Sequence, residues 1–231
     1  MNRSVLLAAA AVLALTAGSA VAASHPALGV RPAHPVPIKS PGKTLYSQNS
    51  NFGYAIISQN FSSTFSATYD AEAVDDFLVP KGRVWSIHGV DVTGAYFNGS
   101  GPATSEVITF YYDSSNKPGK PFGKPQTVNC TDSAGSFACA LNKPVKLDNS
   151  VGQKRARYWV SVVANMAFTA GGEWGWLANT VTRNDPGKWQ NPGDGFGTGC
   201  TKWTDTSTCI PTAGSDDFAF GLTGSQAAER R

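Results

Sequence analysis

Ten short segments rich in β-branched and aromatic residues constrain the fold of this chain more than any other feature. Turn clusters such as NGSGP, NKPGKP and NPGDGFG separate them, and such clusters are typical of loops between strands. No stretch of useful length has the apolar spacing of an amphipathic helix. The segments are 54–61, 63–69, 75–80, 83–92, 105–112, 125–130, 136–141, 157–166, 173–178 and 217–224. The pattern predicts one all-β domain over residues 45–224, a two-sheet antiparallel sandwich of the jelly-roll type.

The first 22 residues have the pattern of a secretory signal peptide. Arg3 precedes an apolar run from Val5 to Leu15, and Ala20 and Ala22 supply the small residues of a cleavage site. The apolar run is too short to span a membrane, which takes about 20 residues. We therefore expect a secreted protein, extracellular or periplasmic, that is cleaved after Ala22 and has no membrane span.

Residues 23–44 contain five prolines and no acidic residue, which predicts an extended spacer before the domain. Its basic residues could contact an anionic cell wall, although a solvated linker is the plainer interpretation. Residues 225–231 are expected to form a disordered tail. The net charge of +3 falls to +2 when Arg3 is removed, which is too small to indicate nucleic-acid or membrane partners.

The four cysteines fall into two pairs with equal spacing, Cys130 with Cys139 and Cys200 with Cys209. Within the first pair, Asp132–Gly135 reads as a hairpin turn that would set the two thiols opposite each other. An oxidising destination favours disulfides, and the spacing is wider than that of a four-thiolate zinc site. We expect two local disulfides.

Two Asp-Asp-Phe triplets stand at opposite ends of the domain, beginning at Asp75 and at Asp216. An early strand and the last strand of a jelly roll commonly lie side by side, so the triplets are expected to share an edge. Alternation along each strand places Asp75 and Asp216 toward the core, and Asp76 and Asp217 outward.

Carboxylates that converge need a cation, a proton or several backbone donors. Calcium is the natural extracellular cation for such a cluster, because it accepts six to eight oxygen ligands in flexible geometry. The sequence thus suggests a structural Ca²⁺ bound by Asp70, Asp75, Asp76, Asp216 and Asp217. The alternative is that these residues only cap turns and protect strand edges.

Several stretches, together with the two triplets, resemble a loosely defined group of bacterial secreted β-sandwich modules. They are GVDVTGAYFNGSGP, FYYDSSNKPG, RYWVSVVANM, GEWGW and WQNPGDGFGTGCTKW, and the similarity covers most of residues 50–224. The resemblance implies the fold and export, and it implies no catalytic residues. In architecture the chain is also similar to carbohydrate-binding jelly rolls, several of which hold a structural calcium near the terminal strands.

Candidate catalytic residues are few. His88 is the one histidine in the predicted domain, and no GxSxG nucleophile elbow is present. Glu173, which precedes Trp174, is the carboxylate best suited to a glycosidase, because nearby indoles would raise its pKa. No second glutamate lies at a recognisable spacing, and Glu173 otherwise reads as a polar, outward position. The sequence favours a protein that is not an enzyme.

Four of the six tryptophans lie between residues 174 and 203. Trp174 and Trp176 point to the same side of a strand, which is either core or a ligand-binding face. Trp189 and Trp203 stand in Gly-, Pro- and Asn-rich loop sequence, so we expect exposed rings that stack on sugars. With Glu173 they form the predicted ligand site.

Lys117, Lys120 and Lys124 alternate with prolines; they would attract an anionic polymer or form a solvated hairpin loop. The function expected from the sequence is an exported, non-enzymatic binding module for extracellular or cell-wall polysaccharide. A structural or accessory protein of the cell exterior is the alternative, and a glycoside hydrolase using Glu173 is the third possibility.

Overall fold

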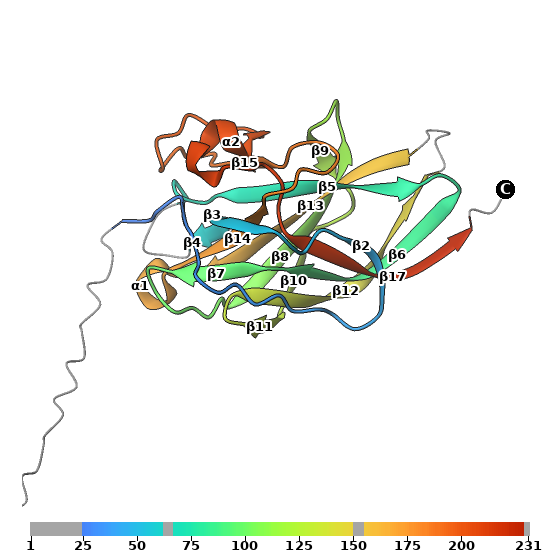
Figure 1. The fold of residues 1–231 in the computed structure, drawn as a ribbon, viewed down its shortest axis with the longest axis horizontal. Coiled ribbons are helices and arrows are strands. Elements are labelled where there is room, and N and C mark those ends of the chain that lie inside the picture. The colour runs from blue at the N-terminus through green and yellow to red at the C-terminus, as the bar shows by residue number, and fades with distance from the viewer. Residues whose placement is uncertain (1–24, 62–66, 150–154, 229–231) are drawn as a thin grey trace, which may run out of the picture.

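The structure is a computed structural model that describes residues 25–61, 67–149 and 155–228. Its strands form three largely antiparallel sheets that curl around one core (Figure 1). The first sheet has the order β1 (Gly29–Val30), β3 (Phe52–Ile57), β14 (Glu173–Asn179) and β7 (Gly94–Phe97). The second follows the order β10 (Gln126–Val128), β8 (Ser105–Asp113), β13 (Arg155–Met166), β5 (Glu72–Pro80), β15 (Lys188–Gln190) and β16 (Thr204–Asp205). In this second sheet β4 (Gln59–Phe61) also pairs with β13, and β9 (Pro118–Pro121) with β8.

The third sheet has the order β11 (Thr131–Ser133), β12 (Ser136–Asp148), β6 (Arg83–Val92), β17 (Phe220–Ala228) and β2 (Lys43–Ser47). Helices are limited to single turns, namely α1 (Phe168–Gly171), α2 (Thr206–Cys209) and the 3₁₀ turn Pro211–Ala213. The loop that carries α2 lies beside β5 and β15, on the side of the molecule opposite β11 and β12 (Figure 1). No helix in the described ranges is both long and apolar enough to cross a membrane.

Aromatic side chains join the sheets. Phe77 on β5 stacks on Trp85 of β6, with ring centroids 6.1 Å apart, and packs edge-on against Phe220 of β17. Phe137 on β12 stacks on Trp174 of β14 with ring centroids 4.8 Å apart. All of these rings are buried. The core therefore lies between the sheets, and the predicted all-β sandwich is confirmed.

Both predicted disulfides are confirmed, Cys130 with Cys139 and Cys200 with Cys209. The first joins the residue before β11 to its neighbour on β12, because the hairpin register pairs Thr131 with Ala138. Of the expected strand 63–69, residues 63–66 lie outside the described residues, and the remainder begins a turn.

Residues 25–42 are not a free spacer, contrary to the prediction. Gly29 and Val30 pair with β3, and the Ala27 amide donates to the carboxylate of Glu173 at 2.7 Å. Farther along, the amide of buried Ser40 donates to Asp91 at 2.5 Å. The proline-rich composition did not indicate these contacts, because the anchors are short: residues 27–30 and Ser40.

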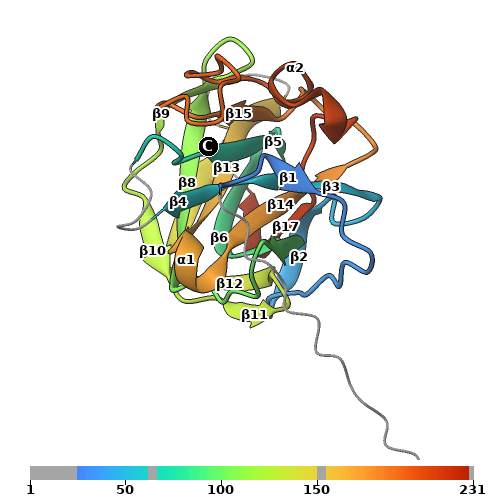
Figure 2. The same ribbon diagram turned by 90° about the vertical axis from the view of Figure 1, so that its left-hand side faces the viewer.

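A bulge in β12 closes the barrel-like end between the second and third sheets. Pairing with β6 is interrupted between Ala140 and Val145, and the extra residues turn toward β10, which lies beside β12 (Figure 2). Gln126 Nε2 donates to Lys143 O at 3.0 Å, and Lys143 N donates to Gln126 Oε1 at 2.9 Å. Asn142 Nδ2 also donates to Thr127 O at 2.8 Å. Side-chain amides thus replace a backbone ladder at this junction.

Candidate functional site

Trp189 is fully buried, so the expectation that its ring is exposed is wrong. It lies on β15, pairs with Ala73 of β5, and its indole Nε1 donates to Ile57 O at 2.9 Å. Trp174 and Trp176 are also fully buried, and their indoles donate to backbone carbonyls of Gly135 and Ala219. These three rings belong to the core.

Trp203 is half-buried and packs edge-on against Tyr111, with ring centroids 5.9 Å apart. Its position attaches the loop of the second disulfide to the outer face of the second sheet. The four tryptophans therefore do not form the predicted sugar-stacking surface.

Glu173 is fully buried, which corrects its expected outward position. Asn98 Nδ2 donates to one carboxylate oxygen at 2.6 Å, and the Ala27 amide donates to the other. Burial raises its pKa to about 7, against the effect of the Asn98 hydrogen bond. Both carboxylate oxygens of Glu173 thus accept hydrogen bonds from within the protein, and the residue attaches the N-terminal segment to the domain.

The two Asp-Asp-Phe triplets meet, although not as neighbours in one sheet. Asp75 lies on β5 of the second sheet, whereas Phe220 opens β17 of the third. The carboxylate of Asp75 accepts hydrogen bonds from Phe218 N and Gln48 Nε2, each at 2.6 Å, and from Asp76 N at 2.7 Å. Asp75 therefore ties the two triplets together across the core.

Asp76 and Asp217 are also fully buried, so their expected outward positions are wrong. Arg157 Nε lies 2.8 Å from Asp76 Oδ2, and Arg183 N donates to Asp217. Desolvation raises the pKa of each carboxyl to about 7 and holds that of Asp75 well above its usual range. The three carboxyls form a buried acidic cluster.

The other two residues of the expected calcium site accept hydrogen bonds from other segments. Asp216 is only partly buried and accepts from Ser207 N at 2.5 Å, next to α2. Asp70 accepts from Phe61 N at 2.7 Å. The polar partners of the cluster are hydrogen-bond donors and an arginine, and Asp76 Oδ1 and Asp217 Oδ1 have no hydrogen-bond partner among the described residues. A Ca²⁺ ion at this cluster stays a prediction.

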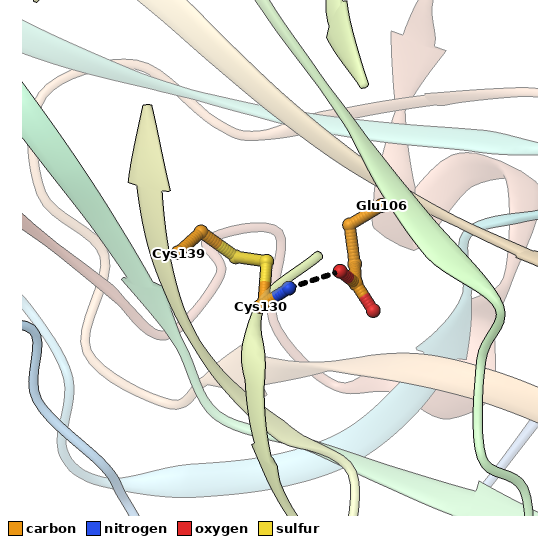
Figure 3. A group of neighbouring side chains, drawn as sticks. All are labelled: Glu106, Cys130 and Cys139. Atoms are coloured by element: carbon orange, nitrogen blue, oxygen red, sulfur yellow. Dashed lines mark hydrogen bonds between the residues drawn. A yellow bond between two sulfur atoms is a disulfide. The ribbon is translucent and has the colours of Figure 1, made fainter. Parts of the chain in front are cut away.

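Within the described ranges, a single group of three potential metal ligands has its ligand atoms within 4.8 Å of one another: Glu106, Cys130 and Cys139. Figure 3 shows that the two sulfurs are joined in the disulfide and that Cys130 N donates to Glu106 at 2.9 Å. A disulfide supplies no thiolate, so this group does not act as a metal site in the oxidised protein.

A surface groove of about 650 Å³ lies at the junction of β10 and β12. One wall is residues 122–127 and the other is residues 142–146. Phe122, Pro125, Pro144 and Val145 contribute the apolar surface. The groove exists because the β12 bulge reaches across to β10 through the amide side chains described above.

An exposed aromatic ring borders this groove. Tyr112, at the end of β8, is 41% exposed, and its ring centroid lies 5.0 Å from that of Phe122, which lines the groove. The Tyr158 ring packs edge-on against that of Phe122, with ring centroids 5.8 Å apart. The ammonium of Lys120 lies 5.5 Å from the Tyr112 ring centroid. The Tyr112 ring is thus a partly exposed aromatic surface beside the groove, with the Lys120 ammonium over it.

Three exposed lysines, Lys124, Lys143 and Lys146, line the groove, and none of its lining residues is acidic. Sequence reasoning identified Lys124 as part of a lysine–proline repeat but missed its partners on β12. The lysine repeat was the signal that could have located the site. Its second wall depends on the bulge at residues 141–144, for which Pro144 inside the strand was the available sequence signal.

The burial of Trp189 predicts a large loss of stability on truncation. Trp189→Ala removes a fully buried indole and its hydrogen bond, so we expect unfolding to become easier by ~3–5 kcal/mol. Trp203→Ala, at a half-buried site, should cost less than half as much. Denaturant unfolding of both variants measures this, and a Trp189→Ala variant as stable as the wild type would contradict the assignment to the core.

The buried acidic cluster predicts that stability falls as the pH rises. Asp76 and Asp217 have folded-state pKa values of about 7, above the ordinary value of 3.8, so protons bind more tightly to the folded state. The stabilisation that these two carboxyl groups contribute to the folded state is complete below pH 3.8. It is lost as the pH rises through about 7.

Thermal unfolding at pH values from 5 to 8 measures this effect. We expect the melting temperature to decrease over that range, and to decrease less in Asp217→Asn, in which the side chain stays neutral. A wild-type melting temperature that stays constant across the range would show that the cluster is already ionised in the folded protein at the lower end of the range.

Comparison with family models, with curated proteins and with solved structures finds no match to this chain. The function proposed below is therefore argued from the groove and its side chains.

Proposed function

We propose that this chain is an exported, non-enzymatic module that binds a polysaccharide along the groove between β10 and β12. The observation that carries the proposal is the exposed Tyr112 ring, which continues through Phe122 into the groove. Aromatic faces stack on sugar rings, and the groove of about 650 Å³ lies beside this ring. The apolar surface that we expected at Trp189 and Trp203 is supplied here by Tyr112 and Phe122.

The non-enzymatic part of the proposal is supported by the state of Glu173. A glycosidase needs two carboxyl groups that flank a bound sugar. Glu173 is fully buried with both oxygens accepting hydrogen bonds from the protein, and no acidic residue lines the groove. Export is supported by the two disulfides, which persist in oxidising compartments.

Affinity electrophoresis of the mature protein through gels that contain soluble polysaccharides tests the proposal. A shallow site of this kind should bind with a dissociation constant on the order of 0.1–1 mM. We expect Tyr112→Ala to lose the retardation, because the stacking face is removed, and Tyr112→Phe to keep it.

Val181→Ala is the matched control, since Val181 is 45% exposed and does not line the groove. All three variants should melt close to the wild type. Retardation of Tyr112→Ala equal to that of the wild type would place the binding surface elsewhere or remove the glycan-binding function.

A further inference from the structure

The charged side chains that line the groove can donate hydrogen bonds but cannot accept them. Its two amide side chains, Gln126 and Asn142, bond to the backbone across the junction. Lys124, Lys143 and Lys146 remain as the exposed charged groups on its walls. An ammonium donates three hydrogen bonds and accepts none, and the lining has no carboxylate to accept from a hydroxyl. The charged side chains of the groove are therefore suited to a ligand rich in acceptors.

The positive charge is local to this surface. Lys117 and Lys120 lie on the adjoining β8–β9 turn and on β9, next to the groove. Among the described residues, none of these five lysines forms an ion pair. The whole chain has 19 Lys and Arg against 16 Asp and Glu, so the cluster is not a consequence of a generally basic protein. Unpaired lysines on both walls attract a negatively charged chain between them.

From these observations we infer that the ligand is an acidic polysaccharide, in which sugar rings contact Tyr112 and Phe122 while their carboxylates meet Lys124, Lys143 and Lys146. The inference rests on the proposed function, because the aromatic ring distinguishes a sugar polymer from other polyanions. The three lysines are exposed, so each ion pair with the ligand would be weak on its own and the three act together.

The test compares polygalacturonate with its fully methyl-esterified form, because the two polymers share a backbone and differ in charge. Binding of the mature protein is measured by titration calorimetry at low and at high salt. We expect the acidic polymer to bind at least about tenfold more tightly than its ester, and expect salt to weaken that binding.

Replacing the three groove lysines by glutamine should weaken binding of polygalacturonate by about tenfold, from about 0.5 kcal/mol for each exposed pair. The control replaces three exposed lysines outside the groove, Lys43, Lys81 and Lys202, so that both variants have the same net charge. Equal losses in the two triple variants would show non-specific attraction and overturn the inference.

The remaining outcomes separate the two proposals. Equal binding of polygalacturonate and its ester, both lost in Tyr112→Ala, would keep the polysaccharide function and overturn the charge inference. Binding of neither polymer would overturn both. Polyglutamate, an acidic chain without sugar rings, should bind more weakly than polygalacturonate; equal or tighter binding would show that the groove recognises acidic peptides instead.

Discussion

The hydrogen bonds to the buried carboxylate of Asp75 are the interaction on which the rest of the structure depends. Two donors from distant parts of the chain, Gln48 Nε2 and Phe218 N, meet there with the amide of the adjacent Asp76. A buried donor left without an acceptor costs about 1–3 kcal/mol; Gln48 Nε2 also donates to Phe218 O. The contact fixes β5 of the second sheet against the segment that enters β17 of the third. Phe77 and Phe220 can then pack face to edge between the sheets.

The opposite junction of the same two sheets is held differently, and this difference produces the groove. At β10 and β12, Gln126 and Asn142 bridge the strands with side-chain amides, beside the Cys130–Cys139 disulfide and the hydrogen bond from Cys130 N to the buried Glu106. Amide bridges hold the strands farther apart than a backbone ladder does, since a side chain lies between them. The space above the bridges is the groove, and the residues free to face it are lysines and prolines.

The sequence predicted what depends on local pattern. Alternation and turn clusters identified the all-β sandwich, and spacing identified both disulfides. The predictions were wrong where contacts between distant segments determine which residues are buried. Trp189 has polar neighbours, yet its three-residue strand is enclosed by β5 and β16. Asp217 was assigned outward by counting back from Phe218, but β17 begins at Phe220, so alternation does not extend to the triplet. The β12 wall of the groove depends on a bulge that contains Pro144, and a proline inside a strand is the residue that marks such a bulge.

The distribution of aromatic residues between the core and the surface explains why the proposed binding surface is not built from tryptophans. Five of the six tryptophans are buried. Four of them fill the core between the three curved sheets, and Trp159 packs in a separate cluster with Val74 and Tyr111, beside Trp203. The indole Nε1 groups of Trp174, Trp176 and Trp189 reach backbone carbonyls inside that core, so exposing any of these rings would break a hydrogen bond as well as uncover apolar area. A ring available to a ligand must therefore come from outside this set. Tyr112 meets that condition. Its neighbour Tyr158 donates a hydrogen bond to the backbone, at Asp148 O, whereas the core does not need the Tyr112 side chain to be buried.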